Sequence, residues 1–203
     1  MPKNNKAVIV AHDRLQAAYE LIEWIGTSSQ EVSFTASERT RVGAACFAVV
    51  QEHHQSIVIL TEHRIFASSF ALLRVAFDAY VRGVWLSLCA TDAEVTAFLA
   101  GKELGNMKTL LAAIESKPEF SSGELSSVKD RSWSAMCDYT HTGSLQVQRW
   151  NTKDAVEPRY TLDEVMEVLQ LAEMLGMMSV ISFAGMINNI ALSHKALAKI
   201  KAM

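Results

Sequence analysis

The chain has 203 residues, of which 50% are hydrophobic and 20% are charged, with three prolines and a formal net charge of −3. This composition excludes a disordered chain, because it supplies enough apolar surface for a core, and the small net charge gives no overall attraction to nucleic acid. The length predicts a single domain, residues 1–203, that buries a substantial core.

The spacing of apolar residues predicts an all-α bundle. A first helix is expected from Lys6 to Gly26, with Gly26 as its C-terminal stop. After a polar linker, Ser37 is placed to cap a second helix. That helix runs toward His53 and His54 and continues, with or without a break, to about residue 64. We interpret the two histidines as part of a solvated helix end.

The stretch from Phe66 to Ala90 is the one around which we expect the bundle to be organised. It is apolar around almost its whole circumference and contains no proline, which is typical of a long, buried central helix. Arg74, Asp78 and Arg82 are spaced four residues apart, so they form one column along this helix. We expect apolar side chains to enclose these charges, and buried charges require partners. The column is therefore either an internal ion-pair ladder, which sits at the edge of the bundle or fixes helix register, or an anion pocket.

Capping-box patterns of the form Thr-x-x-Glu predict two further helix starts, at Thr91 and at Thr161. Between them we expect a short helix over residues 104–116 and a longer one over 128–141, followed by a loop that can hold a short strand or hairpin. The helix from Thr161 is predicted to be the longest and to run to the C-terminus.

This last helix contains a segment without formal charge, Met174 to Ser193, that is long enough to cross a bilayer. Its serines and asparagines, and the acidic residues before it, favour a core helix or a helix–helix dimer face over a membrane span. The N-terminal apolar run is too short for a signal peptide, and three widely separated cysteines fit reduced thiols. We therefore expect a cytoplasmic protein without a membrane segment.

A second group of polar residues lies in the sequence DYTHTG, residues 138–143. Asp138 and His141 are three residues apart near a helix end, so the carboxylate can orient the imidazole for general acid–base work. The alternative is ordinary helix capping, in which His141 faces the negative end of the helix dipole. The sequence contains no zinc-type cysteine pair, glycine-rich phosphate loop or Glu-x-x-His pair, so we expect no metal and no cofactor.

The segment ALLRVAFDAYVRGVWL, residues 71–86, together with DYTHTG resembles a group of bacterial all-helical proteins that are similar to HEPN-type domains. The resemblance covers about residues 37–203. HEPN-type domains are helical bundles, many of them ribonuclease toxins or phage-defence effectors. The resemblance implies metal-independent handling of RNA or of a nucleotide phosphate. Nine residues separate Arg131 from His141, a longer spacing than that of the HEPN nuclease motif.

Two functional hypotheses follow. In the first, an enzyme acts on RNA or nucleotides, and the predicted catalytic residues are His141, Asp138 and Arg74. The predicted substrate-binding residues are Arg82, Asp78, Tyr139 and Arg149. In the second, the chain is a non-catalytic helical module that forms a homodimer or binds a partner protein, and the charged column only sets helix register.

Overall fold

The computed structural model describes residues 8–30 and 32–203, and within these ranges it contains nine α-helices, one short 3-10 helix and no strand. The predicted all-α bundle is therefore confirmed. The helices, in chain order, are α1 (His12–Gln30), α2 (Glu38–Glu62), α3 (Phe66–Leu88), α4 (Asp92–Leu99), α5 (Met107–Glu115), η1 (Pro118–Phe120), α6 (Glu124–Thr140), α7 (Ser144–Gln148), α8 (Leu162–Met186) and α9 (Ile190–Lys201).

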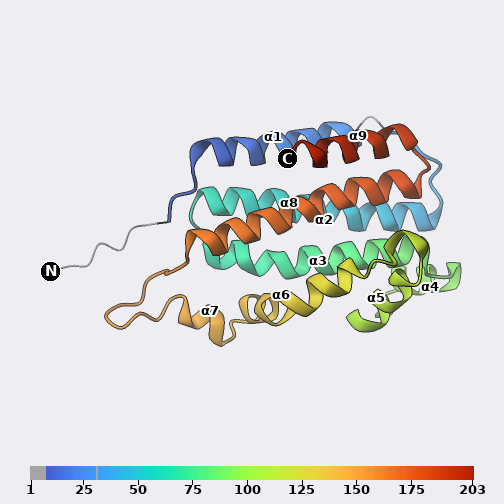
Figure 1. Cartoon of the computed structure of the whole chain (residues 1–203). Coiled ribbons are helices and arrows are strands. Elements are labelled where there is room, and N and C mark those ends of the chain that lie inside the picture. The colour runs from blue at the N-terminus through green and yellow to red at the C-terminus, as the bar shows by residue number, and fades with distance from the viewer. Residues whose placement is uncertain (1–7, 31) are drawn as a thin grey trace.

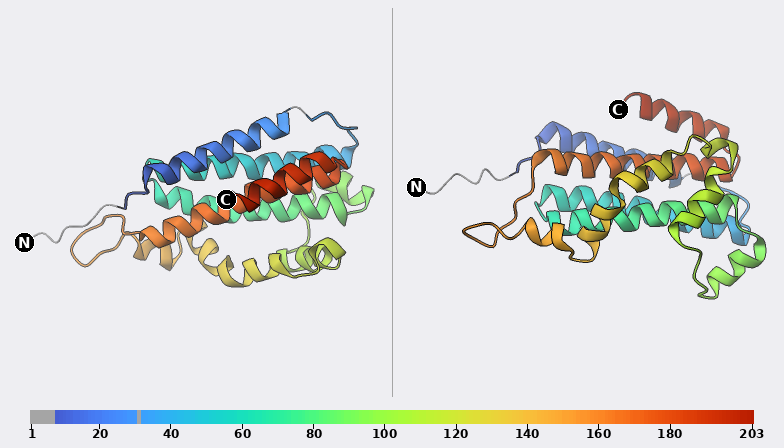
Figure 2. Two further views of the ribbon diagram at one scale, coloured as in Figure 1. Left: turned by 45° about the horizontal axis from the view of Figure 1, so that its top comes forward. Right: turned by 60° about the horizontal axis from the view of Figure 1, so that its bottom comes forward.

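Helices α2, α3 and α8 form the centre of the bundle. α3 packs against α2, α8, α6 and α5, and α2 also packs against α8. Figure 1 shows α1 and α9 on one side of these central helices and α4 to α7 on the other side. The two further views in Figure 2 keep α6 and α7 beside α3, so α3 separates the main core from this outer group of helices.

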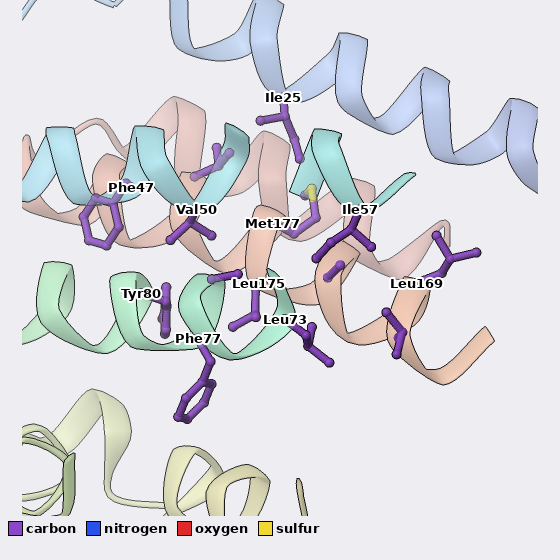
Figure 3. Close-up of a cluster of buried hydrophobic side chains, with 14 of the residues drawn as sticks. Ile25, Phe47, Val50, Ile57, Leu73, Phe77, Tyr80, Leu169, Leu175 and Met177 are labelled. Carbon is purple, nitrogen blue, oxygen red and sulfur yellow. The ribbon is translucent and has the colours of Figure 1, made fainter. Parts of the chain in front are cut away.

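The core lies where α2, α3 and α8 meet. Figure 3 shows Phe47 and Val50 of α2 facing Tyr80 of α3, with Leu175 and Met177 of α8 beside them. All five side chains are almost completely buried. Burial of one such aliphatic or aromatic side chain contributes about 1.5–3 kcal/mol, so packing of this kind outweighs the weak intrinsic stability of the separate helices.

The predicted helix starts are confirmed by their caps. Ser37 accepts a hydrogen bond from the backbone N–H of Thr40 at 3.1 Å. Thr91 and Thr161 each form a complete capping box, in which a glutamate three residues later returns a hydrogen bond to the threonine backbone. These caps are present in the folded chain because they provide acceptors for the backbone N–H groups that the first turn of a helix leaves unpaired.

The predicted second helix is confirmed in its unbroken form, because α2 is continuous to Glu62. Two other predicted helix boundaries are wrong. The first helix does not stop at Gly26: this residue keeps helical geometry and α1 continues to Gln30. The expected start of that helix at Lys6 lies outside the described residues. The last helix is two helices, since Asn188 takes a left-handed conformation, φ 56°, which asparagine adopts more readily than most residues.

The loop after α6 also differs in part from its expectation. It contains α7 and then one isolated antiparallel bridge between Asn151 and Val156, which is less than a strand. The predicted hairpin is thus present only as a single paired position.

The column of charges on α3 is only partly buried, so the expectation that apolar side chains enclose it is wrong. Arg82 pairs with Asp78 at 3.1 Å, and their side chains are 36% and 25% exposed. Arg74 is half-buried, with its guanidinium 4.9 Å from the centre of the Trp133 ring. The face of α3 that carries these residues lies at the edge of the core, where its apolar neighbours are also only half-buried: Leu72, Val75 and Ala79.

α8 is long and apolar enough to cross a membrane by length and composition. Of its most apolar 18-residue window, 61% is buried inside the bundle. This burial is typical of the core helix of a soluble protein, and it accounts for the uncharged stretch without a lipid environment.

Gly83 allows α3 to approach α2 closely. A methyl group there would lie 2.8 Å from Cε1 of Phe47 and 2.9 Å from Cβ of Cys46. We expect Gly83→Ala to push the two helices apart and to lower the free energy of unfolding by about 1–3 kcal/mol. Chemical denaturation measures this change.

Gly26→Ala in α1 is the matched control, because an added methyl group there has no neighbour within 4 Å. The higher helix propensity of alanine should raise the free energy of unfolding by up to about 1 kcal/mol. If both variants were stabilised, the α2–α3 contact would be looser than described.

Candidate functional site

A cleft of about 260 Å³ lies between α6 and α8, with α3 as its floor and α7 at one end. Two of the predicted binding residues, Tyr139 and Arg149, line it. The floor is apolar and the walls combine apolar with polar side chains, of which the charged ones carry both signs: Arg131, Arg149, Glu164 and Glu167.

Aromatic rings form a rigid wall at one end of this cleft. Phe70 of α3 contacts Tyr139 edge-on, with ring centroids 4.9 Å apart, and contacts Tyr160 at the same distance. Burial raises the pKa of both tyrosines, despite the opposing effect of the nearby Arg149 charge. Both phenols are therefore neutral at physiological pH and keep their O–H donors.

Arg149 and Glu164 form an ion pair at this aromatic end. Nη2 of Arg149 donates to Oε1 of Glu164, while Oε2 of Glu164 accepts from the backbone N–H and the hydroxyl of Thr161, both at 2.9 Å. Burial opposes both charges. The hydrogen bonds outweigh it, so the pKa of Arg149 is raised and that of Glu164 is lowered. Both groups are therefore charged, and Nε of Arg149 is buried without a hydrogen-bond partner among the described residues.

The position of Arg149 follows from how α7 is anchored. Oδ2 of Asp138, near the end of α6, accepts hydrogen bonds from the backbone N–H of Leu145 at 3.0 Å and from Oγ of Ser144 at 3.3 Å. Asp138 thus caps the first turn of α7, and Arg149 caps the other end of that helix. The backbone N–H of Arg159 then donates to the carbonyl of Arg149 at 2.6 Å, which holds the following loop against the same residue.

Asp138 and His141, predicted to act as a pair, have separate surroundings. His141 is exposed and caps the C-terminus of α6, with its backbone N–H donating to Cys137 at 2.9 Å. No hydrogen bond or ion pair between Asp138 and His141 occurs in the described structure, because His141 has already left the helix, at φ −106° and ψ 17°. A spacing of three residues aligns side chains only inside a helix. The position of His141 matches the capping alternative.

The arginines of the α3 column lie outside the cleft lining. Oγ1 of Thr140 donates to the carbonyl of Ala71 at 3.0 Å, which marks where the end of α6 meets α3. Arg82 follows eleven residues later, about 16 Å further along the helix axis. His141 and Arg82 are therefore too far apart to share one small ligand. Arg74, one turn from Ala71, lies nearer to the end of α6.

Sequence reasoning missed two carboxylates of the cleft, Glu164 and Glu167. The capping box identified Glu164, but only as a helix cap, and nothing in the sequence brings α8 beside α6. Arg131 was considered only for its spacing to His141. Within the described part of the chain, no three His, Cys, Asp or Glu side chains gather in a way that could hold a metal ion.

A second polar cluster lies between α1, α2 and α8. Arg14 makes two hydrogen bonds of 2.7 Å to the carboxylate of Glu173, which is 5% exposed. His54 is 1% exposed, so the expected solvated helix end is wrong. Its ring packs against α8 at Gly176, where a methyl group would lie 2.9 Å from Nδ1 of His54. Burial, with a smaller effect of the Arg14 charge, lowers the pKa of His54 to about 4.

Residues 47–202 match the model of the Family of unknown function (DUF6988). The matched range includes α3, α6, α7 and α8, and therefore all residues that line the cleft. No curated protein and no solved structure matches the chain.

His54 should make stability depend on pH. Its pKa is about 4 in the folded chain and about 6.5 when exposed, so the unfolded chain binds a proton that the folded chain excludes. Stability should therefore fall as the pH decreases from about 6.5 to 4, by up to about 3 kcal/mol from this group. In denaturation series across this range, His54→Leu should lose that part of the dependence. His63→Gln, which changes an exposed histidine, should keep it.

Asp138→Ala should loosen α7, because it removes the acceptor for Leu145 and Ser144. We expect faster amide hydrogen exchange over residues 144–149 and a loss of about 1 kcal/mol of local stability. Asp138→Asn keeps an acceptor oxygen and should preserve most of the protection. His141→Ala is the control, and an equal loss of protection in that variant would support the original Asp138–His141 pair.

Proposed function

We propose that this chain, which belongs to the Family of unknown function (DUF6988), binds a phosphate-bearing ligand, a nucleotide or an RNA end, in the cleft between α6, α7 and α8. The observation that carries the proposal is the placement of Arg149. Its guanidinium is held by Glu164 in a cleft of mixed polar and apolar lining, at the end of a helix that Asp138 fixes in place.

Arg149 has the chemistry of a phosphate contact. An arginine side chain has five N–H donors in a planar fork that matches two oxygens of a phosphate or carboxylate, and here the fork is only partly used by Glu164 and Tyr139. The site is partly withdrawn from water, so a charge-assisted hydrogen bond there is stronger than on the open surface. Arg131, exposed at the mouth of the same cleft, supplies a second positive charge for an approaching anion.

The size and walls of the cleft suit one nucleotide unit. Its volume of about 260 Å³ lies just below the range of about 300–1,000 Å³ for pockets that hold drug-sized molecules. A ligand in this cleft is therefore no larger than about one nucleotide. Phe70, Leu73 and Tyr139 offer the apolar and aromatic surface on which a base or sugar packs. A ligand with a phosphate is also what the resemblance to HEPN-type domains implies.

The geometry supports binding more strongly than catalysis. The predicted catalytic pair is divided, since Asp138 caps α7 and His141 is exposed at the end of α6. In the α3 column, Arg82 and Asp78 form a partly exposed ion pair, and Arg74 packs over the ring of Trp133. The alternative function, a non-catalytic dimerisation module, draws on a different surface, formed by α1 and α9.

Variants of the cleft arginines test the proposal. Inorganic phosphate and the four ribonucleoside 5′-monophosphates are titrated against the purified chain by calorimetry. Arg149→Lys keeps the charge but loses the fork, and should weaken nucleotide binding at least about tenfold. Arg131→Gln, at an exposed site, should weaken it by about two- to fivefold.

Arg82→Gln is the matched control, because it removes an arginine from the α3 column and leaves the cleft intact. Its affinity should equal that of the natural chain. Absence of binding for all five probes at millimolar concentration would refute the proposal. A loss of binding in Arg82→Gln with full binding in Arg149→Lys would move the site to the α3 column.

A further inference from the structure

The side of the bundle formed by α1 and α9 carries a groove away from the ligand cleft. α9 packs against α8, and α1 packs against α2 and α8, so α8 lies between them. The left view of Figure 2 shows α1 and α9 at a similar tilt on this face of the bundle. The groove measures about 560 Å³ and is floored by Met174 and Met177 of α8.

Large apolar side chains on this face have no partner within the described part of the chain that covers them. Two methionines that line the groove are largely exposed: Met174 of α8 is 56% exposed, and Met203, just after α9, is 62% exposed. Exposed apolar side chains that gather in one place mark an interaction surface more often than single, scattered ones do. Methionine side chains are flexible, so they adapt easily to the surface of a partner.

Charges of opposite sign lie on the two helices that flank the groove. The outer face of α1 is acidic, with Asp13, Glu20 and Glu23 exposed. α9 is basic, with Lys195, Lys199 and Lys201 and no acidic residue. Both sets lie beside the apolar centre, which gives this face the common arrangement of a protein interface, an apolar centre with a polar rim.

We propose that a second copy of this chain docks on this face about a two-fold axis, with α9 of each copy against α1 of the other. In a two-fold interface the same patch meets itself, so each contact between two residues occurs twice. The acidic α1 and the basic α9 meet this requirement, because rotation brings each sign opposite the other. The exposed Met174 and Met203 then become the buried centre. The proposal is independent of the ligand cleft, which lies between α6 and α8.

Sedimentation velocity on the full chain, combined with charge exchange, tests this dimer. The natural chain should be a dimer at micromolar concentration. Glu20→Lys with Glu23→Lys should raise its dissociation constant at least about tenfold, and so should Lys195→Glu with Lys199→Glu. Carrying all four changes in one chain should restore the constant to within about threefold of the natural value, because the complementary signs return.

Met174→Ser provides a second variant that leaves every charge in place, and it should also weaken the dimer at least about tenfold. Lys108→Glu, an exposed charge reversal on α5, is the control and should leave the dimer unchanged. Circular dichroism confirms that each variant keeps its helices. A natural chain that stays monomeric at about 100 μM overturns the proposal, and so does a dimer that persists in both charge pairs and in Met174→Ser. Nucleotide binding, measured on the same variants, separates failure of the dimer from failure of the ligand proposal.

Discussion

The close packing of α2 against α3 is the constraint on which the rest of the bundle depends. Gly83 lets the backbone of α3 lie against Phe47 and Cys46, which leaves no space for a side chain between them. α3 is then fixed with one side in the core and the opposite side toward α6. Phe70 and Leu73 reach the floor of the cleft from this closely packed helix, so the cleft is built on the central helix of the bundle.

Glu164 links the local folding of α8 to the chemistry of the cleft. One of its oxygens completes the capping box with Thr161, and the other pairs with Arg149. The first interaction forms within a few residues and depends only on the start of α8. The second joins segments fifteen residues apart and fixes the end of α7. A residue that the helix start already requires therefore also fixes the position of the arginine beside it.

Most of the secondary structure could be predicted from the sequence, because caps and apolar periodicity act over a few residues. The N-caps are an example: Ser37, Thr91 and Thr161 predicted the starts of α2, α4 and α8 correctly. The orientation of α3 could not be predicted, since an apolar circumference shows that burial is favourable without showing which side a neighbour covers. The charged column was therefore expected inside the core and lies at its edge.

The candidate site was predictable only in part, for a related reason. Tyr139 and Arg149 were identified because they follow a polar helix end, and they do share a cleft. Asp138 was assigned the wrong neighbour, because the chain turns after Thr140 and presents the N–H of Leu145 to the carboxylate first. His54 was placed in solvent because its burial depends on Gly176, which is distant in sequence and leaves room for the imidazole ring. Contacts between segments far apart in sequence decide each of these cases.

The apolar character of α8 follows from its position between the cleft and the groove. Val168 and Leu171 line the cleft, while Gln170 and Glu173 line the groove beside α1 and α9. Leu171 and Glu173 are two residues apart, so they lie on roughly opposite sides of a helix that turns about 100° per residue. α2 and α3 cover much of what remains. A helix enclosed on so many sides has little surface left for charge. Of its four charged residues, Glu164, Glu167 and Glu173 lie at the cleft or the groove, and Asp163 is exposed in the first turn. Apolar composition that resembles a membrane span thus arises here from the number of neighbours around one helix.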